Sequence, residues 1–215
     1  VAQDLYFNKY QAANARVGFD LRGMPKSLTG QVGVHIDTAV VAGVTIDTIG
    51  GVLRFSDFTQ ADFDLAAASK NGPSARAGGT WTSLNGANDV LLSSARFTIG
   101  GGDWNLVMPA KVHADTSVLA IDSLLLRRDS ATIALRGTVP DTGTASGELR
   151  ALRVPLRDLG VLAQLSDTLD GVGDLTVTVG GTKRAPVIDG KLALAGIKWS
   201  GLDIPQSDAD AHFRD

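Results

Sequence analysis

The chain has 215 residues, with 23 Asp and Glu against 20 Lys and Arg, and its formal net charge is −3 at pH 7. This length allows one large domain with a sizeable core. The basic residues are scattered and form no stripe that could collect phosphates, which argues against a nucleic-acid partner. The sequence has no cysteine, which excludes thiolate zinc sites, disulfides and a cysteine nucleophile and suits an oxidising compartment such as the bacterial periplasm.

The balance of residue types favours strands and turns over helices. Glu148 is the only glutamate among the 23 acidic residues, and 25 residues are glycine. Asp and Gly favour turns, whereas Glu is a good helix former. The first ten residues lack the pattern of a signal peptide, and the longest mostly apolar run, residues 38–46, is about half as long as a membrane-spanning helix. We therefore expect a soluble, all-β piece.

Strict alternation of apolar and polar residues recurs along the chain and predicts strands with one apolar face. Turn clusters such as "NGPS", "SLNGAND" and "PDTGTASG" separate these segments, so consecutive strands are expected to pair antiparallel. We count roughly a dozen strands by these rules. The clearest segments, in chain order, are "RVGFDLR" (16–22), "QVGVHID" (31–37), "DFDLA" (62–66), "ARFTIG" (95–100), "DWNLVM" (103–108), "VLAID" (118–122), "ATIALRG" (131–137) and the two strands of "GDLTVTVGGTKRAPVIDGKLALAG" (173–196).

One segment breaks this period. Residues 155–165 carry Leu156, Leu159, Leu162 and Leu165 at spacings of three, and Pro155 suits the first position of a helix. We predict one short helix over 155–165. Its apolar stripe is expected to cover the apolar face or the open end of the sheet.

An internal repeat relates residues 17–55 to residues 175–213. Gly23 matches Gly181, Gly43 matches Gly201 and Phe55 matches Phe213, each pair 158 positions apart. Both copies share the order strand, polar loop, Gly, strand, Gly, strand, which is harder to obtain by chance than a lone glycine match. We therefore interpret residues 1–215 as one β-rich slice of a longer repeat array, interrupted by the helix.

Two stretches of the chain are similar to the bacterial TamB family, within the AsmA-like lipid-transfer proteins. In residues 149–196 a strand and a short Leu-rich helix lead into a Gly-flanked hairpin, with a "P-x-x-x-G" loop at Pro186 to Gly190. Residues 119–139 are similar to the family's recurrent pair of strands. The resemblance implies a long sheet curled into an open apolar trough (a β-taco), and a parent protein anchored in the inner membrane that crosses the periplasm. It also implies phospholipid transport, an outer-membrane barrel partner and no catalytic residues.

Elementary packing leads to the same shape without the resemblance. A large sheet with one wholly apolar face must cover that face, and the predicted helix is too short to cover a dozen strands. A curled sheet also accommodates repeats, because a closed barrel cannot be lengthened by adding units. We predict that acyl chains of phospholipid lie against this face, lined by Phe19, Leu21, Val34, Ile36, Phe63, Leu65, Leu106, Ile121, Ile133, Leu135, Val177, Val179, Leu192 and Leu194.

No pattern in the sequence predicts catalysis, a metal site or a cofactor. His35, His113 and His212 lie on different predicted strands, and the paired carboxylates of "DFD" and "DAD" are expected to face solvent. "IGGGDW" lacks the helix and the Lys-Ser or Lys-Thr pair of a phosphate loop, so we interpret it as a turn or bulge. The large aromatic residues are interpreted as core fillers; they are Phe19, Phe55, Trp81, Trp104 and Trp199.

Two other classes of function can be compared with lipid binding. The chain could be a structural subunit of a membrane-associated assembly, with its apolar face filled by its own side chains or those of a partner. An exported β-solenoid adhesin would need rungs of about 20 to 30 residues, which the 158-residue repeat does not support.

Overall fold

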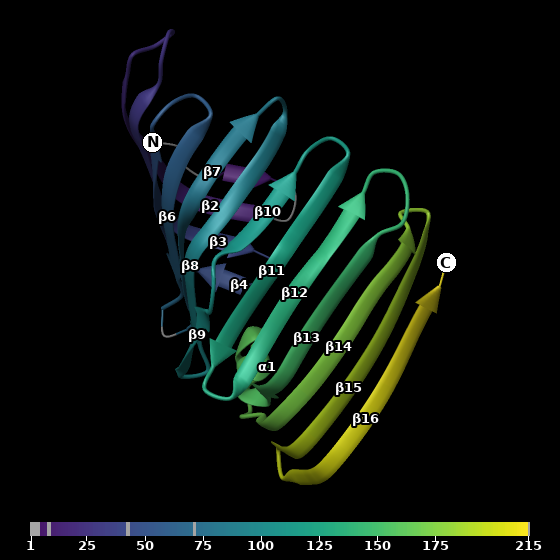
Figure 1. The fold of residues 1–215 in the computed structure, drawn as a ribbon. Helices are drawn as coiled ribbons and strands as arrows, with labels where there is room; N and C mark the ends of the chain where they lie inside the picture. Colours follow the sequence, from purple (N-terminus) through teal and green to yellow (C-terminus); the bar gives the residue numbers. More distant parts are fainter. Residues whose placement is uncertain (1–4, 8–9, 42–43, 71, 215) are drawn as a thin grey trace.

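A computed structural model describes residues 5–7, 10–41, 44–70 and 72–214 of the chain. In these residues the protein is one antiparallel sheet of 16 strands with a single short helix (Figure 1). This confirms the predicted all-β class, the large antiparallel sheet and the presence of one helix. The count of roughly a dozen strands was low, in part because β1 and β4 have three residues each, too few for alternation to reveal.

The strands follow one another along the chain with mostly short connections. Their bounds are β1 (Leu5–Phe7), β2 (Tyr10–Arg22), β3 (Thr29–Val41), β4 (Val44–Ile46), β5 (Thr48–Phe55), β6 (Gln60–Ala68), β7 (Ser74–Leu84), β8 (Ala87–Ile99), β9 (Gly102–Leu106), β10 (Ala110–Ala114), β11 (Val118–Arg128), β12 (Ala131–Pro140), β13 (Ser146–Pro155), β14 (Asp170–Thr182), β15 (Ala185–Trp199) and β16 (Leu202–Arg214).

The sheet is a meander, so neighbours in the sheet are almost always neighbours in the chain. The order runs from β1 to β16 with two short side strands. In the described residues β4 pairs with β3. β9 pairs with β8 and β11, and β10 pairs with other parts of the same two strands. Every described pairing is antiparallel. Local hairpin connections therefore suffice to build the sheet.

Strand register aligns the alternating residues of all the long strands into rows. One row crosses the sheet from β2 to β16, and residues paired in this way lie on the same face. We call the face that carries this row the apolar face. The row consists of Leu21, Gly30, Phe55, Ala61, Trp81, Val90, Val112, Ile121, Gly137, Gly147, Val179, Ile188 and Phe213.

The opposite face carries polar rows, and we call it the polar face. One of these rows runs through Arg136, Glu148, Thr178, Asp189 and His212. The alternation seen in the sequence is thus a division between two faces that persists over the whole width of the sheet.

The sheet curves strongly about its apolar face. Ala67 of β6 and Val154 of β13 line the same pocket, although six strand spacings would separate them by about 29 Å in a flat sheet. Figure 1 shows the N-terminal strands passing behind β8 to β11. An open trough along the whole sheet remains a prediction.

The helix α1 spans Leu156–Leu162, with Pro155 as its N-cap residue. It is shorter than the predicted 155–165. Gln164 has φ of 55°, and the Leu165 amide donates to the Gly160 carbonyl while the Gln164 amide donates to the Val161 carbonyl. This is a Schellman turn, which ends a helix at a residue in the left-handed conformation. Leu165 therefore lies beyond the helix.

The two copies of the repeat have the same register. Leu21 pairs with Gly30 and Gly30 with Phe55 in β2, β3 and β5, and the residues 158 positions later, Val179, Ile188 and Phe213, pair in the same way in β14, β15 and β16. The turn glycines Gly23 and Gly181 have φ of 84° and 77°. The match at Gly43 lies outside the described residues. That residues 1–215 are a slice of a longer array stays a prediction.

The buried core is small and lies next to α1. It consists of Trp104, Ala131, Ala151 and Val154, and among the described residues no large side chain is fully buried. The interpretation of the large aromatic residues as core fillers is right for Trp104 but wrong for Phe19 and Trp199, which are 75% and 44% exposed. Both side chains lie on strands that the rest of the described sheet leaves uncovered.

Candidate functional site

The 14 residues predicted to line a trough all lie on the apolar face. Their strands differ, but cross-strand pairing places them in four adjacent rows. The rows contain, in turn, Leu21, Ile121 and Val179; Phe19, Phe63, Leu135 and Val177; Val34, Leu65, Leu106, Ile133 and Leu192; and Ile36 and Leu194. Their contact with lipid stays a prediction.

Four of these residues come together in one pocket near the middle of the sheet. Ile121, Leu135, Val177 and Val179 line a hollow of about 210 Å³ between β11 and β14. Leu149 lies directly between Leu135 and Val177 in the same row and lines the same pocket. The sequence-based set omitted Leu149, although the alternation of β13 places it on the same face as Ala151.

A second pocket lies at the α1 end of the apolar face. It has a volume of about 330 Å³ and is bounded by β4 and β6 to β9 on one side, by β11 to β13 on the other, and by α1. Ile133 is the one member of the predicted lining set that borders it. Leu159 and Leu162 of the helix stripe also border it, whereas Leu156 packs over Gly171 and Gly173. We call this pocket the α1 pocket.

Much of the apolar face is exposed to solvent outside these pockets. Phe19 is 75% and Phe213 is 53% exposed, and Val17, Leu65, Phe97, Leu119 and Ile188 of the same face are also exposed. Glycines leave room for neighbouring side chains to spread over the sheet: Leu65 reaches over Gly51 and the Phe63 ring over Gly79. Exposed apolar side chains gathered on one face of a sheet are typical of a site for a partner or an apolar ligand.

A buried ionic cluster fixes α1 to the sheet. The carboxylate of Asp158, 3% exposed, accepts hydrogen bonds from the Trp104 indole at 2.7 Å and from Arg128 Nη1 at 2.7 and 2.8 Å. Arg128 Nη1 also donates to the Ile99 carbonyl. Because each charge has partners, the cluster avoids the large penalty of an isolated buried charge.

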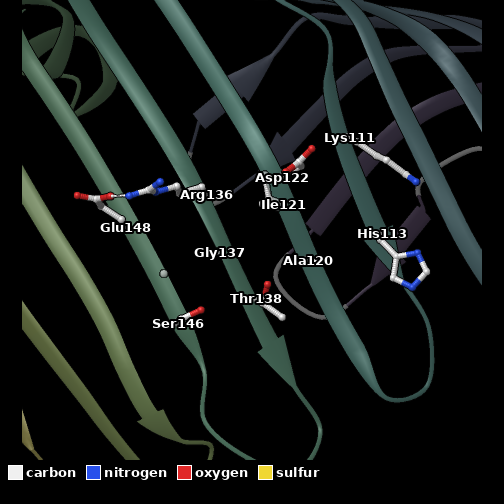
Figure 2. Close-up of a pocket in the computed structure, with 11 residues that line it drawn as sticks. Lys111, His113, Ala120, Ile121, Asp122, Arg136, Gly137, Thr138, Ser146 and Glu148 are labelled. Carbon is white, nitrogen blue, oxygen red and sulfur yellow. Dashed lines mark hydrogen bonds and ion pairs between the residues drawn. The ribbon is translucent and has the colours of Figure 1, made fainter.

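The polar face has a broad hollow of about 660 Å³ over β10 to β13, and Figure 2 shows the charged residues around it. Most of these charges are paired, either with one another or with neighbouring carboxylates. Arg136 Nη2 lies 2.6 Å from Glu148 Oε2, and this hydrogen bond lowers the pKa of Glu148, with a further contribution from Arg150. Lys111 lies 3.5 Å from Asp89. The arrangement is a surface ion-pair network.

His113 in the same hollow is held by two carboxylates. Its Nδ1 lies 2.8 Å from Asp89 and its Nε2 lies 3.4 Å from Asp115, and these bonds raise the pKa of His113, the Asp89 bond most. The pKa of Asp115 falls to about 2, chiefly because the backbone and hydroxyl of Ser117 donate to it. No nucleophile is hydrogen-bonded to His113 in the described part of the chain.

The other residues weighed for chemistry are spread over the sheet. His35 lies 3.0 Å from Asp37 and His212 lies 2.6 Å from Asp189. The "DFD" and "DAD" carboxylates lie on the polar face, with Asp62 accepting from Thr80. Within the described residues no three His, Asp or Glu side chains are grouped as metal ligands. Gly100 and Gly101 form the turn between β8 and β9.

Comparisons of the chain with protein-family models, with curated proteins and with solved structures found no match. Among the described residues, no helix combines the length and the apolar character that crossing a membrane requires.

Proposed function

We propose that this chain is a non-enzymatic, lipid-binding segment of a TamB-like envelope protein, and that it holds phospholipid acyl chains against its apolar face. The observation that carries the proposal is the set of apolar rows that cross the curved sheet while leaving large side chains such as Phe19 and Phe213 exposed. Exposing such side chains costs free energy unless something apolar covers them.

The energetics suit a conduit for hydrocarbon. Two acyl chains of about 16 carbons each face a gross penalty of roughly 25 kcal/mol in water, at about 0.8 kcal/mol per CH₂. A continuous apolar surface reduces this penalty equally at every position, so a chain can slide with a low barrier while its escape into water stays costly. A headgroup would remain at the solvent side, where it keeps its hydration.

The setting that we propose is the periplasm, with the parent protein anchored in the inner membrane. The absence of cysteine is compatible with that oxidising compartment. The resemblance to the TamB family supports an outer-membrane barrel, or another membrane-associated complex, as the protein partner. No nucleic acid and no cofactor enter the proposal.

Replacement of Leu135 tests the proposal. Leu135→Asp puts a charge in the central pocket between Leu149 and Leu124, and we expect it to abolish copurification of phospholipid, measured by extraction and mass spectrometry. Ala134→Asp is the control, because Ala134 is next to Leu135 but lies on the polar face opposite Arg150. Equal phospholipid in both variants, with unchanged circular dichroism, would contradict the proposal.

A second function, that of a structural subunit, is favoured by the exposed side chains of the apolar face, among them Val17 and Leu65. A protein partner that packed against them would remove them from water as lipid would. A clean protein mass without lipid, together with a stable β spectrum, would favour this function over lipid binding.

A further inference from the structure

The α1 pocket differs from the rest of the apolar face because it is bordered on several sides. Phe97 lies on one arm of the curved sheet and Ile133 on the other, and α1 contributes Leu159 and Leu162. Trp104, which is 2% exposed, also borders it. At the α1 end of its strands the apolar face thus has a pocket with walls on several sides.

Most of the polar side chains around this pocket already have partners in the protein; the Ser74 hydroxyl is the exception among the described residues that line it. Asp158 is bound by Arg128 and Trp104. The Ser69 hydroxyl donates to the Thr45 carbonyl at 2.7 Å, and the Thr98 hydroxyl donates to Asp103 at 2.6 Å. A polar ligand group would lose its hydration here without gaining these partners, whereas hydrocarbon loses nothing. The chemistry of the pocket therefore selects an apolar occupant.

The size of the pocket limits that occupant to one chain. Its volume is about 330 Å³, at the lower end of the range of about 300–1,000 Å³ found for ligand pockets. This volume suits the end of a single hydrocarbon chain better than a headgroup with two chains.

We propose that the α1 pocket is a terminal site for one acyl chain of a lipid, which enters with its methyl end first and stops at α1. The inference rests on the proposed function. It adds the place where the acyl chain ends and the direction in which the chain lies. The cluster of Arg128, Asp158 and Trp104 acts by positioning α1 as the wall where the chain ends.

Fluorescence of Trp104 provides the test. The chain has three tryptophans, so Trp81→Phe and Trp199→Phe together leave Trp104 as the only one. The probes are single-chain fatty acids that carry bromine, a contact quencher, either near the methyl end or near the carboxyl group. We expect methyl-end bromine to remove most of the Trp104 fluorescence and carboxyl-end bromine to remove little of it.

A variant that fills the pocket is compared with a matched variant that does not. Ala75 on β7 borders the pocket, so Ala75→Phe should occupy it and abolish the quenching. Ala77, two residues along the same strand and on the same face, pairs with Leu65 and Ala95 outside the pocket, so Ala77→Phe should leave the quenching unchanged. If Ala75→Phe does not fold, the two bromine positions in the unfilled protein decide the question alone.

The outcomes separate this inference from the proposed function. Fatty acid seen bound by native mass spectrometry, with equal quenching from both bromine positions or none from either, would overturn the terminal site and leave lipid binding in place. Fatty acid and phospholipid both absent from the native mass spectrum would overturn the proposed function and the inference with it.

Discussion

At the scale of single residues, Asp158 is a buried charge that joins α1 to the sheet. Its side chain is 4% exposed and that of Arg128 is 17% exposed, so this pair is shielded from water and from salt. Breaking a buried pair by removing one partner leaves an uncompensated charge, which costs far more than the loss of a surface pair.

We predict that Asp158→Ala lowers the free energy of unfolding by about 3–5 kcal/mol, because it leaves the Trp104 indole without its acceptor and the Arg128 charge without its carboxylate. Urea denaturation measures this change. The control is Asp170→Ala, which removes the exposed pair with Arg157 and should cost at most about 1 kcal/mol. Similar losses in the two variants would show that the buried cluster does not hold α1 in place.

His113 gives a prediction that depends on pH. The hydrogen bonds to Asp89 and Asp115 favour the protonated imidazole and raise the pKa of His113 above 6.5. A raised pKa in the folded state means that the stabilisation is fully present below pH 6.5 and is lost as the pH rises through the folded value. In an NMR titration, Asp89→Asn should move the pKa of His113 back toward 6.5, since it removes the largest cause. An unchanged titration would contradict the assignment.

At the scale of elements, the β14–β15 hairpin depends on the conformation of Gly181. Its φ is 77°, and a Cβ atom there would lie 2.3 Å from the Ala185 carbonyl oxygen. We predict that Gly181→Ala destabilises the fold by about 1–2 kcal/mol, measured as a shift in the urea midpoint. Gly180→Ala is the control, because a Cβ at Gly180 would meet nothing within 4 Å. A larger loss of stability in Gly180→Ala than in Gly181→Ala would contradict this role of Gly181.

The long strands were predictable because their alternation is a local property of the sequence. Each of the segments quoted from the sequence, such as residues 16–22 and 131–137, overlaps a strand of the structure. The end of the helix was not predictable from the leucine spacing, because Leu165 continues the spacing while Gln164 turns the backbone into the left-handed region. Very short strands such as β4 were missed because three residues contain no period.

At the scale of the whole molecule, the membership of the apolar face was predictable but the shape of that face was not. Alternation assigns Leu135 and Val177 to one face, whatever the curvature. The cluster that closes the α1 end joins Asp158 to Arg128 and Trp104, which lie 30 and 54 residues away in the chain. No local pattern contains these pairings, since they depend on how far the sheet curves.

The proposed function requires that hydrocarbon covers the apolar face. Val177 lines the central pocket, and its neighbour Thr176 lies on the polar face between Arg150 and Lys191. Val177→Asp and Thr176→Asp therefore place the same charge on opposite sides of one strand. The two variants are a matched pair that tests whether lipid binds to the apolar face.

The decisive measurement is native mass spectrometry of the gently purified chain and of these two variants, with lipid extraction of the same samples. The account predicts bound phospholipid in the unmodified chain and in Thr176→Asp, and its loss in Val177→Asp with strand content retained. A lipid-free mass for the unmodified, folded chain, or equal lipid in all three proteins, would contradict the account.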